Sequence, residues 1–461
     1  MGALPKTSFP PEFRFGVATS AYQIEGAVHE DGRGESIWDR FCQTPGRILD
    51  GDNGDVACDH YHRWERDLDL IAELGLDTYR FSIAWPRIVP DGRGGINQSG
   101  LDFYRRLVEG ALERGIKPLA TLYHWDLPQA LEDTGGWTNR ETAVAFAEYA
   151  EVVVAALGDV VTDWITQNEP WVSAVEGYAQ GKKAPGVTDW PSAICASHHL
   201  LLSHGLAIDA FRAVGPADGR IGITLNLAPM IPASDTEIDV AAAVRADGYH
   251  NRWYLDPVLR GRYPADMLEH YAAHSVDLAF IDDGDEAIIG RPTDFLGVNY
   301  YSVGRIHDAS DASEGDASFL GFEFLPAREP VTAMGWEIAP SAFTDLLIRL
   351  DRDYGPLPMM ITENGGAFGE EASDWSVQDP ARVAFLAAHF DAAQKAIAKG
   401  VDLEAYFVWS LLDNFEWESG YRPRFGIVRV DYETQERTLK DSALWYRDLV
   451  ARHRPVKLGA T

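Results

Sequence analysis

Short runs of β-branched and aromatic residues recur along the chain, separated by longer stretches in which apolar residues follow a helical spacing. Runs that are apolar at successive positions are typical of parallel strands buried on both faces. Eight such runs predict strands at residues 13–19, 78–83, 118–123, 164–167, 221–226, 295–300, 359–362 and 405–410. The pattern therefore predicts a buried, largely parallel sheet.

The stretches between these runs carry apolar residues three and four positions apart, as helices do when one face covers a core. They predict helices at 67–74, 101–114, 142–157, 194–214 and 381–399. Such alternation favours a parallel α/β fold, either an open doubly wound sheet or a closed barrel. No Gly-x-Gly-x-x-Gly turn follows the first strand, so we expect the barrel. The prediction is one (β/α)8 TIM barrel domain over residues 1–461, with its active site at the C-terminal ends of the strands.

The net charge of the chain argues against some classes of binding partner. Asp and Glu number 71 against 40 Lys and Arg, and the resulting net charge of −31 repels nucleic acid and anionic lipid. No apolar run reaches the roughly 18 residues that a membrane span requires. We therefore expect a small neutral substrate, no nucleic-acid or membrane partner, and either single subunits or a homo-oligomer.

The cysteines and the first residues bear on location. Cys42, Cys58 and Cys195 form no C-x-x-C pair, which favours free thiols in a reducing compartment and no structural metal. The opening string MGALPKTSFPPEF lacks the basic and apolar segments of a secretory signal. Both features predict a cytoplasmic location.

Two glutamates follow the apolar part of predicted strands. Glu169 lies in WITQNEP after the fourth strand, and Glu363 lies in MMITENG after the seventh. Residues that follow the strands of a barrel meet at one mouth, so we expect both carboxyl groups in one pocket. Glycoside hydrolysis requires such a pair, with one carboxyl protonated to donate to the leaving oxygen and the other ionised to attack or stabilise the sugar.

The strings around these glutamates resemble those of family 1 of the glycoside hydrolases, the β-glucosidase family. TQNEP is similar to the family's T-x-N-E-P string, and ITENG to its I-T-E-N-G string. Further similar strings follow in the family's order along nearly the whole chain: FRFGVATSAYQIEG, DHYHRW, FSIAWPRI, TLYHWDLPQ, LGVNYY, WSLLDNFEW, RFGIVRVDY and KDSALWY. The resemblance implies a (β/α)8 barrel that acts on β-glycosides.

This resemblance implies specific roles for the two glutamates. Glu169 corresponds to the family's acid/base and Glu363 to its nucleophile. A retaining reaction through a covalent glycosyl-enzyme follows, for which the two carboxyl groups lie about 5 to 5.5 Å apart. The resemblance implies no cofactor and no metal.

The resemblance also assigns residues to the sugar and to the nucleophile. Sugar-binding residues are expected at Gln23, His124, Asn168, Tyr301, Trp336, Trp409, Glu416 and Trp417. An indole suits the apolar face of a pyranose, so Trp409 would be the stacking floor, while Trp336 would hold the aglycone or second sugar. Support of the nucleophile is expected from Arg80, Asn299 and Tyr301, because a nearby cation keeps a carboxylate ionised.

Two positions on the aglycone side depart from the family. Gln167 stands where the family often has an aromatic or aliphatic residue, and Lys183 stands in GKKAPG where it often has histidine. Both departures leave the aglycone preference open, since Lys183 brings a positive charge near the leaving-group side. The intact FEW string around Glu416 favours a glycone without a 6-phosphate, which a carboxylate would repel.

Several histidines and one polar stretch are interpreted as structural. The histidines lead into or lie on predicted helices and are not expected to bind metal: His60, His62, His198, His199 and His204. The stretch 308–318 (DASDASEGDAS) is expected to be a solvated loop on the active-site face, or else a lid.

The sequence therefore predicts a retaining β-glucosidase that releases terminal β-D-glucosyl residues, and also β-galactosyl or β-fucosyl residues, from oligosaccharides or from aryl and alkyl glycosides. Degradation products of cellulose belong to this substrate class. The alternatives are a transglycosylating or 6-phospho-β-glycosidase member of the same family, a non-catalytic sugar-binding barrel, and a metal-dependent barrel hydrolase.

Overall fold

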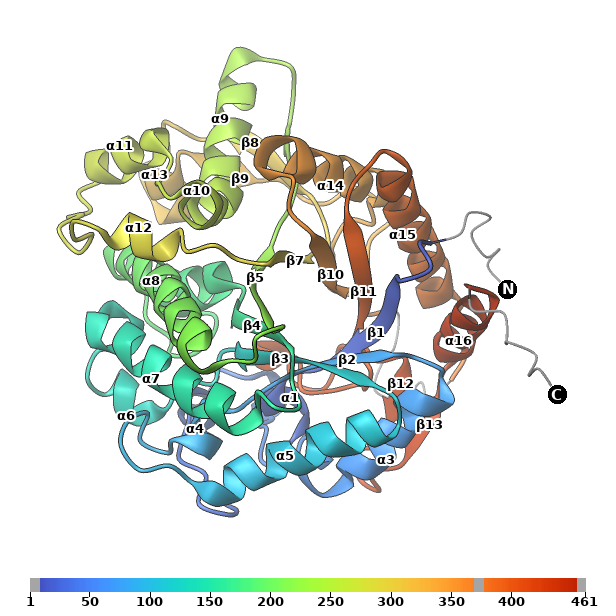
Figure 1. Ribbon diagram of the computed structural model, residues 1–461. Coiled ribbons are helices and arrows are strands. Elements are labelled where there is room, and N and C mark those ends of the chain that lie inside the picture. The colour runs from blue at the N-terminus through green and yellow to red at the C-terminus, as the bar shows by residue number, and fades with distance from the viewer. Residues whose placement is uncertain (1–8, 369–376, 454–461) are drawn as a thin grey trace.

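The computed structural model describes residues 9–368 and 377–453. Its parallel strands close into a barrel in the order β1-β11-β10-β7-β5-β4-β3-β2, which Figure 1 shows at the centre of a ring of helices. The barrel strands are β1 (Arg14–Ala18), β2 (Thr78–Ser82), β3 (Lys117–Tyr123), β4 (Asp163–Asn168), β5 (Arg220–Asn226), β7 (Phe295–Asn299), β10 (Met359–Asn364) and β11 (Leu403–Trp409). All eight predicted strands and the (β/α)8 fold are confirmed.

The barrel closes because the first and last of these strands pair in parallel, from Arg14 opposite Ala405 to Ala18 opposite Trp409. Every residue of β2, β4, β7 and β10 is buried. Side chains on the inner face fill the barrel, and those on the outer face pack against helices, so neither face meets water. At the start of the strands, the Asp163 carboxylate pairs with Arg14 at 2.6 Å.

Amphipathic helices cover the outside of the barrel (Figure 1). The long ones are α3 (His60–Glu73), α5 (Gln98–Glu113), α7 (Arg140–Leu157), α8 (Trp190–Val214), α14 (Pro340–Tyr354), α15 (Pro380–Ala398) and α16 (Asp441–His453). The five predicted helices are present. The first begins earlier than predicted, at His60 instead of residue 67, because His60 is buried and its Nδ1 lies 2.8 Å from Asp67.

The connection between β5 and β7 is long and carries its own elements. They are β6 (Met230–Pro232), α9 (Glu237–Asp247), the π-helix η4 (Gly248–Arg252), α10 (Trp253–Arg260), α11 (Ala265–Ala273) and α12 (Asp285–Ile289). After β7, strands β8 (Gly304–Asp308) and β9 (Phe322–Phe324) join β6 in a small sheet beside the barrel mouth.

The polar stretch 308–318 is not a simple loop, so this prediction is wrong in part. Asp308 ends β8, and α13 (Gly315–Leu320) begins inside the stretch. The helix is held because Phe319 stacks on Trp190 with ring centroids 4.6 Å apart, and Asp316 accepts a hydrogen bond from Gln180 at 2.9 Å. The apolar anchor follows the polar run, where composition alone did not reveal it.

Shorter elements complete the connections. They are α1 (Ala21–Ile24), α2 (Ile37–Cys42), η1 (Leu49–Gly51), α4 (Trp85–Ile88), α6 (Gln129–Glu132), η2 (Gly136–Thr138), η3 (Val172–Ala179), η5 (Trp417–Ser419), β12 (Val428–Val430) and β13 (Arg437–Leu439). Within the described ranges, no helix combines the length and the apolar character needed to cross a membrane.

Candidate active site

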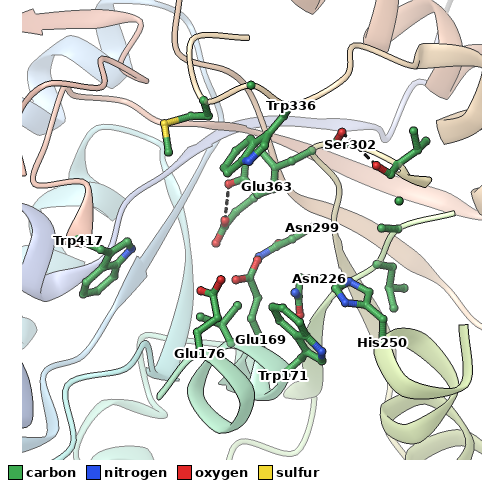
Figure 2. Close-up of a pocket in the computed structure, with 18 of the residues that line it drawn as sticks. Glu169, Trp171, Glu176, Asn226, His250, Asn299, Ser302, Trp336, Glu363 and Trp417 are labelled. Atoms are coloured by element: carbon green, nitrogen blue, oxygen red, sulfur yellow. Dashed lines mark hydrogen bonds between the residues drawn. The ribbon is translucent and has the colours of Figure 1, made fainter. Parts of the chain in front are cut away.

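A cavity of about 540 Å³ lies at the C-terminal mouth of the barrel, and both Glu169 and Glu363 are on its wall. Their side chains are nearly buried, with 5% and 3% of the residue surface exposed. Figure 2 shows the two carboxyl groups directed into the same space, with Asn299 beside Glu169. The volume is that of a pocket for a small molecule. The closed fold thus brings together two acids that are far apart in the sequence.

Irregularities in β4 and β10 aim these glutamates. The register of β4 with β5 shifts between Ile165 and Asn168, and that of β10 with β7 shifts between Ile361 and Glu363. Such bulges turn the side chains that follow them to a different face of the sheet. The backbone of Glu169 also has a φ of 49°, a left-handed conformation that is costly for a residue with a side chain and is concentrated at active sites.

Two donors hold the Glu363 carboxylate. Arg80 Nη1 donates to Oε1 at 2.5 Å, and the Tyr301 hydroxyl donates to Oε2 at 2.6 Å. Burial raises the pKa of Glu363, while the Arg80 cation and the Tyr301 hydrogen bond work against that rise. Arg80 is itself buried, and its Nη2 donates to Asn168 Oδ1 at 2.6 Å, which fixes the cation beside the carboxylate.

Glu169 has a different environment. Burial raises its pKa well above the ordinary value, and the negative charge of Glu363 raises it further. Its Oε1 accepts a hydrogen bond from Asn299 Nδ2 at 2.6 Å. Since the Arg80 cation contacts Glu363 and not Glu169, the proton of this coupled pair belongs on Glu169. The site therefore holds one neutral acid and one carboxylate.

Asn299, which was expected to support the nucleophile, interacts with both glutamates. Its amide nitrogen donates to Glu169 at 2.6 Å and to Asn168 at 3.1 Å, and its oxygen accepts from Thr362 at 2.8 Å. Thr362 immediately precedes Glu363 in β10. Asn299 therefore links the two glutamates, and its hydrogen bonding works against the rise in the pKa of each carboxyl group.

His124 and Glu416 place buried polar atoms on the cavity wall. Within the part of the chain that the structure describes, His124 Nδ1 and Glu416 Oε2 have no hydrogen-bond partner. Buried polar atoms are normally paired, so both are suited to hydroxyl groups of a ligand. Burial raises the pKa of Glu416 to about 8. Burial and the Arg80 charge lower the pKa of His124 well below its ordinary value, so its ring is neutral.

Two of the expected sugar-binding amides lie behind that wall. Asn168 Nδ2 and His124 Nε2 are 3.1 Å apart, so Asn168 holds the imidazole in place. Gln23 lies in α1 and donates from Nε2 to the Phe415 carbonyl at 2.8 Å, directly before Glu416. Both amides are fully buried, so in this arrangement they contact the residues that form the wall.

Aromatic rings line the remaining sides. Trp409 ends β11 and stacks against His124, with ring centroids 5.8 Å apart. Trp417 lies 4.6 Å from the Trp125 ring, and Trp336 lies 5.3 Å from the ring of Tyr301. Figure 2 shows Trp336 and Trp417 on different sides of the cavity. Flat apolar surfaces beside unpaired polar atoms are what a pyranose ring requires.

The two departures on the aglycone side have different outcomes. Gln167 donates from Nε2 to Ser203 of α8 at 2.8 Å, because the bulge in β4 turns it toward the helix layer. Gln167 therefore faces the helix layer and is not among the residues that line the cavity. Lys183 does line the cavity, but its Nζ lies 2.6 Å from Glu418 and 3.3 Å from Glu176, so its positive charge is compensated.

The five histidines that were interpreted as structural have protein partners. The contacts join His60 to Asp67, His62 to Asp59, His198 to Asp285, His199 to the Trp137 carbonyl and His204 to Thr166. In residues 9–368 and 377–453, no group of three or more His, Cys, Asp or Glu side chains could hold a metal ion.

The residues on the wall that were missed from the sequence include Trp171, Glu176, Asn226 and His250. Asn226 ends β5, so the rule that directed attention to strand ends could have found it. Trp171 follows Glu169 by two residues and belongs to the same turn of chain. His250 lies in η4, far from any barrel strand in sequence, and carried no signal.

Comparisons with known proteins agree with this geometry. The sequence profile described as glycosyl hydrolase family 1 matches residues 5–455. β-Glucosidase A of Acetivibrio thermocellus is 49% identical over 97% of this chain and 99% of its own length. A bifunctional β-D-glucosidase/β-D-fucosidase of Bifidobacterium breve is 46% identical over 96% of this chain and 98% of its own.

Solved structures extend the similarity to three dimensions. The family 1 β-glucosidase from Thermotoga maritima superimposes with a TM-score of 0.91 at 47% identity, covering 97% of this chain and 98% of that one. A structure of the same enzyme in complex with glucoimidazole also has a TM-score of 0.91. Both the profile and these relatives span nearly the whole sequence, and the chain therefore belongs to glycosyl hydrolase family 1.

Proposed function

We propose that this family 1 hydrolase is a retaining β-glucosidase, with Glu363 as nucleophile and Glu169 as acid/base. One observation carries the proposal: an ion-paired carboxylate and a neutral carboxylic acid face the same cavity. The names of the relatives, β-glucosidases and in one case also a β-fucosidase, support glucose as the glycone and fucose as a second.

The first step forms a covalent intermediate. Glu363 attacks the anomeric carbon, the bond from that carbon to the glycosidic oxygen breaks, and Glu169 gives its proton to the departing oxygen. The aglycone leaves as a neutral alcohol. Arg80 and Tyr301 hold the attacking carboxylate in place until it loses its negative charge by forming the ester bond.

The second step reverses these roles. Glu169, now a carboxylate, takes a proton from water as the water oxygen attacks the anomeric carbon. The ester bond to Glu363 breaks, and Glu363 recovers its charge beside Arg80. Two inversions at the same carbon give net retention. A second sugar can replace water at this point, but the relatives' names favour hydrolysis.

The glycone side of the cavity supports an unphosphorylated sugar. Glu416 Oε2 and His124 Nδ1 are placed to bind hydroxyl groups, and Trp409 offers its ring face. A phosphate would meet the Glu416 carboxyl group, and Lys183, whose charge acts on Glu416, is already paired with two other acids. The 6-phospho-glycosidase alternative is therefore not favoured.

We also propose a domain organisation, a cellular location and a class of natural substrate. We treat residues 1–461 as one catalytic domain, since the family profile spans 5–455; residues 1–8, 369–376 and 454–461 lie outside the described ranges. The three free cysteines support a cytoplasmic enzyme. Its substrates in that setting would be short β-linked glucose oligosaccharides, including those released from cellulose.

The function is tested with a panel of nitrophenyl glycosides and β-linked disaccharides. We expect the highest kcat/KM for β-glucosides, measurable hydrolysis of β-fucosides and β-galactosides, and no hydrolysis of α-glucosides. Proton NMR of the first minutes of reaction should show β-glucose before mutarotation. Initial α-glucose would contradict the retaining mechanism, and inactivity on every β-glucoside would overturn the proposed function.

The proton on Glu169 predicts a pH dependence. Since its pKa is raised, kcat/KM should fall as the pH rises through that pKa, because the deprotonated form cannot protonate the leaving oxygen. The negative charge of Glu363 contributes to the rise, so Glu363→Gln should lower the pKa of Glu169. Carboxyl ¹³C NMR titration of the two proteins measures this. An unchanged or higher pKa in the variant would contradict the coupling.

A further inference from the structure

One wall of the cavity is a segment of irregular chain. β5 ends at Asn226 and β6 begins at Met230, and Leu227 and Ala228 lie between them. All four residues line the cavity. Loops of this kind are mobile unless their backbone groups are bound. Backbone hydrogen bonds of 3.0 Å hold its two ends, from the Leu227 nitrogen to the Asn299 carbonyl and from the Gly304 nitrogen to the Pro229 carbonyl, so the Ala228 peptide groups between them need a partner of their own.

Asn251 holds them with both ends of its side-chain amide. The Ala228 backbone nitrogen donates to Asn251 Oδ1 at 3.2 Å, and Asn251 Nδ2 donates to the Ala228 carbonyl at 2.8 Å. The Asn251 amide thus pairs with both the N–H and the C=O of Ala228, as a residue of a neighbouring β-strand would. Asn251 is 1% exposed and is absent from the cavity wall, so it acts on the wall from behind.

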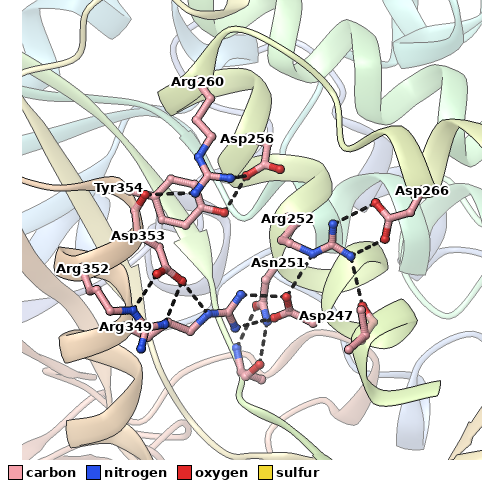
Figure 3. Close-up of polar contacts among 12 residues, drawn as sticks. Asp247, Asn251, Arg252, Asp256, Arg260, Asp266, Arg349, Arg352, Asp353 and Tyr354 are labelled. Carbon is pink, nitrogen blue, oxygen red and sulfur yellow. Dashed lines mark hydrogen bonds and ion pairs between the residues drawn. The ribbon is translucent and has the colours of Figure 1, made fainter. Parts of the chain in front are cut away.

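A half-buried ion pair orients the amide of Asn251. Its Nδ2 also donates to Asp247 Oδ1 at 2.7 Å, so the amide cannot turn over without placing its oxygen against a carboxylate. Arg349 of α14 grips Asp247 with two hydrogen bonds of 2.6 and 2.7 Å. Burial opposes the charge on Asp247, but the hydrogen bonds and charge of Arg349, together with Asn251 and Arg252, hold the pKa of Asp247 below its ordinary value. Figure 3 shows this chain of contacts from Arg349 to Asn251.

The π-helix η4 joins this support to a residue that faces the cavity. His250 lines the cavity and packs on Trp171 with ring centroids 4.6 Å apart, while the next residue, Asn251, binds Ala228. The wider π-helical turn continues directly from α9, which ends at Asp247. Single π-helical turns of this kind are frequent at functional sites. The contacts that join Arg349, Asp247 and Asn251, called the clamp below, therefore fix the position of the Ala228 segment and of His250.

Resting on the proposed function, we propose that Asn251, held by Asp247 and Arg349, is a positioning residue for the leaving group. It touches neither glutamate and acts through the wall formed by Ala228 and His250. That wall lies on the side of Trp171 and Asn226, away from Trp417 (Figure 2). The clamp therefore selects the second sugar of a disaccharide and leaves the bound glucose unaffected.

The experiment compares two substrates that share a glucosyl group. Cellobiose carries a full sugar as leaving group, whereas β-glucosyl fluoride carries a single atom that reaches no wall. Asn251→Ala should lower kcat/KM for cellobiose by about 10- to 100-fold, the cost of a misplaced binding surface. Its kcat/KM for the fluoride should stay within about threefold of the unmodified protein, since glycone binding and nucleophilic attack are unchanged.

The same network supplies a second variant and a control. Arg349→Met removes the grip on Asp247 from a partly exposed helix position and should reproduce the selective loss even if Asn251→Ala fails to fold. Asp266→Asn breaks the adjacent Arg252–Asp266 ion pair of 2.6 Å but keeps the Arg252–Asp247 contact of 3.2 Å and both hydrogen bonds from Arg349, so it should leave both substrates unaffected.

The outcomes separate the two proposals. Equal losses on cellobiose and the fluoride in the folded variants, or an equal selective loss in Asp266→Asn, would overturn the positioning role. Failure of the unmodified protein to hydrolyse either substrate would instead overturn the β-glucosidase assignment on which this role rests.

Discussion

Replacement of Glu363 by glycine is expected to lower kcat/KM for nitrophenyl β-glucoside by about 10⁴- to 10⁶-fold, the range observed when an enzyme loses its covalent nucleophile. The reason is that the variant loses the carboxylate oxygen that forms the glycosyl ester. Arg80 and Tyr301, which donate to Glu363, offer no nucleophilic oxygen that could replace it at neutral pH. Initial rates at low substrate concentration measure the loss.

Azide should restore turnover in this variant and report the face of attack. A small anion fits the space left by the side chain, beside Arg80, and attacks the anomeric carbon while Glu169 protonates the departing aglycone. The single inversion gives α-glucosyl azide, which NMR identifies. Isolation of the β-azide would exchange the roles of Glu169 and Glu363.

The matched control is Glu176→Gln, which removes a carboxylate that also lines the cavity. Glu176 pairs with Lys183 at 3.3 Å and holds neither Arg80 nor Tyr301. We expect its kcat/KM to stay within about tenfold of the unmodified protein, as for a group outside the reacting atoms, with no effect of azide. A loss as large as that of Glu363→Gly would contradict the assigned nucleophile.

Replacement of Glu169 by alanine should have an effect that depends on the leaving group. For cellobiose, whose departing alcohol requires a proton, kcat/KM should fall by about 10²- to 10⁴-fold, the usual contribution of a general acid. For 2,4-dinitrophenyl β-glucoside, which leaves as a stable anion, kcat/KM should fall by less than about tenfold. A plot of log kcat/KM against leaving-group pKa should therefore become steeper.

The second step provides an independent check on Glu169. Without a base to activate water, the glycosyl-enzyme of Glu169→Ala should accumulate, and kcat for the dinitrophenyl substrate should fall. Azide needs no base, so it should raise kcat and yield β-glucosyl azide, the opposite anomer from that of Glu363→Gly. The same loss for every leaving group, with no azide product, would contradict an acid/base role.

Much of the fold follows from the hydrophobic pattern. The eight strands were predicted because each run is rich in β-branched and aromatic residues, as expected for strands that are buried on both faces, and every residue of β2 and β7 is indeed buried. Helices were predicted less completely. In α14, Phe343, Leu347 and Leu350 have regular helical spacing and were overlooked. In α9 the pattern itself misleads, because Ile238 is 60% exposed while Asp239 is buried.

The candidate acids also follow from the sequence, since Glu169 and Glu363 stand where strands end. Their surroundings do not. The alternation of side chains along a strand does not reveal that bulges in β4 and β10 turn Gln167 toward α8 and Glu363 into the cavity. Each bulge arises from the pairing of a strand with its neighbours, so its position depends on residues distant in the chain.

Residue types and their order along the chain were therefore sufficient for the barrel, for its mouth and for the pair of acids that lies there. Only the packed structure placed Asn299 against Glu169, paired Lys183 with two glutamates, and brought His250 to the wall from a helix in the β5–β7 connection. The reason is physical: burial and period are local properties of a sequence, whereas a hydrogen bond, a charge balance or a pKa belongs to groups that only closure of the barrel brings together.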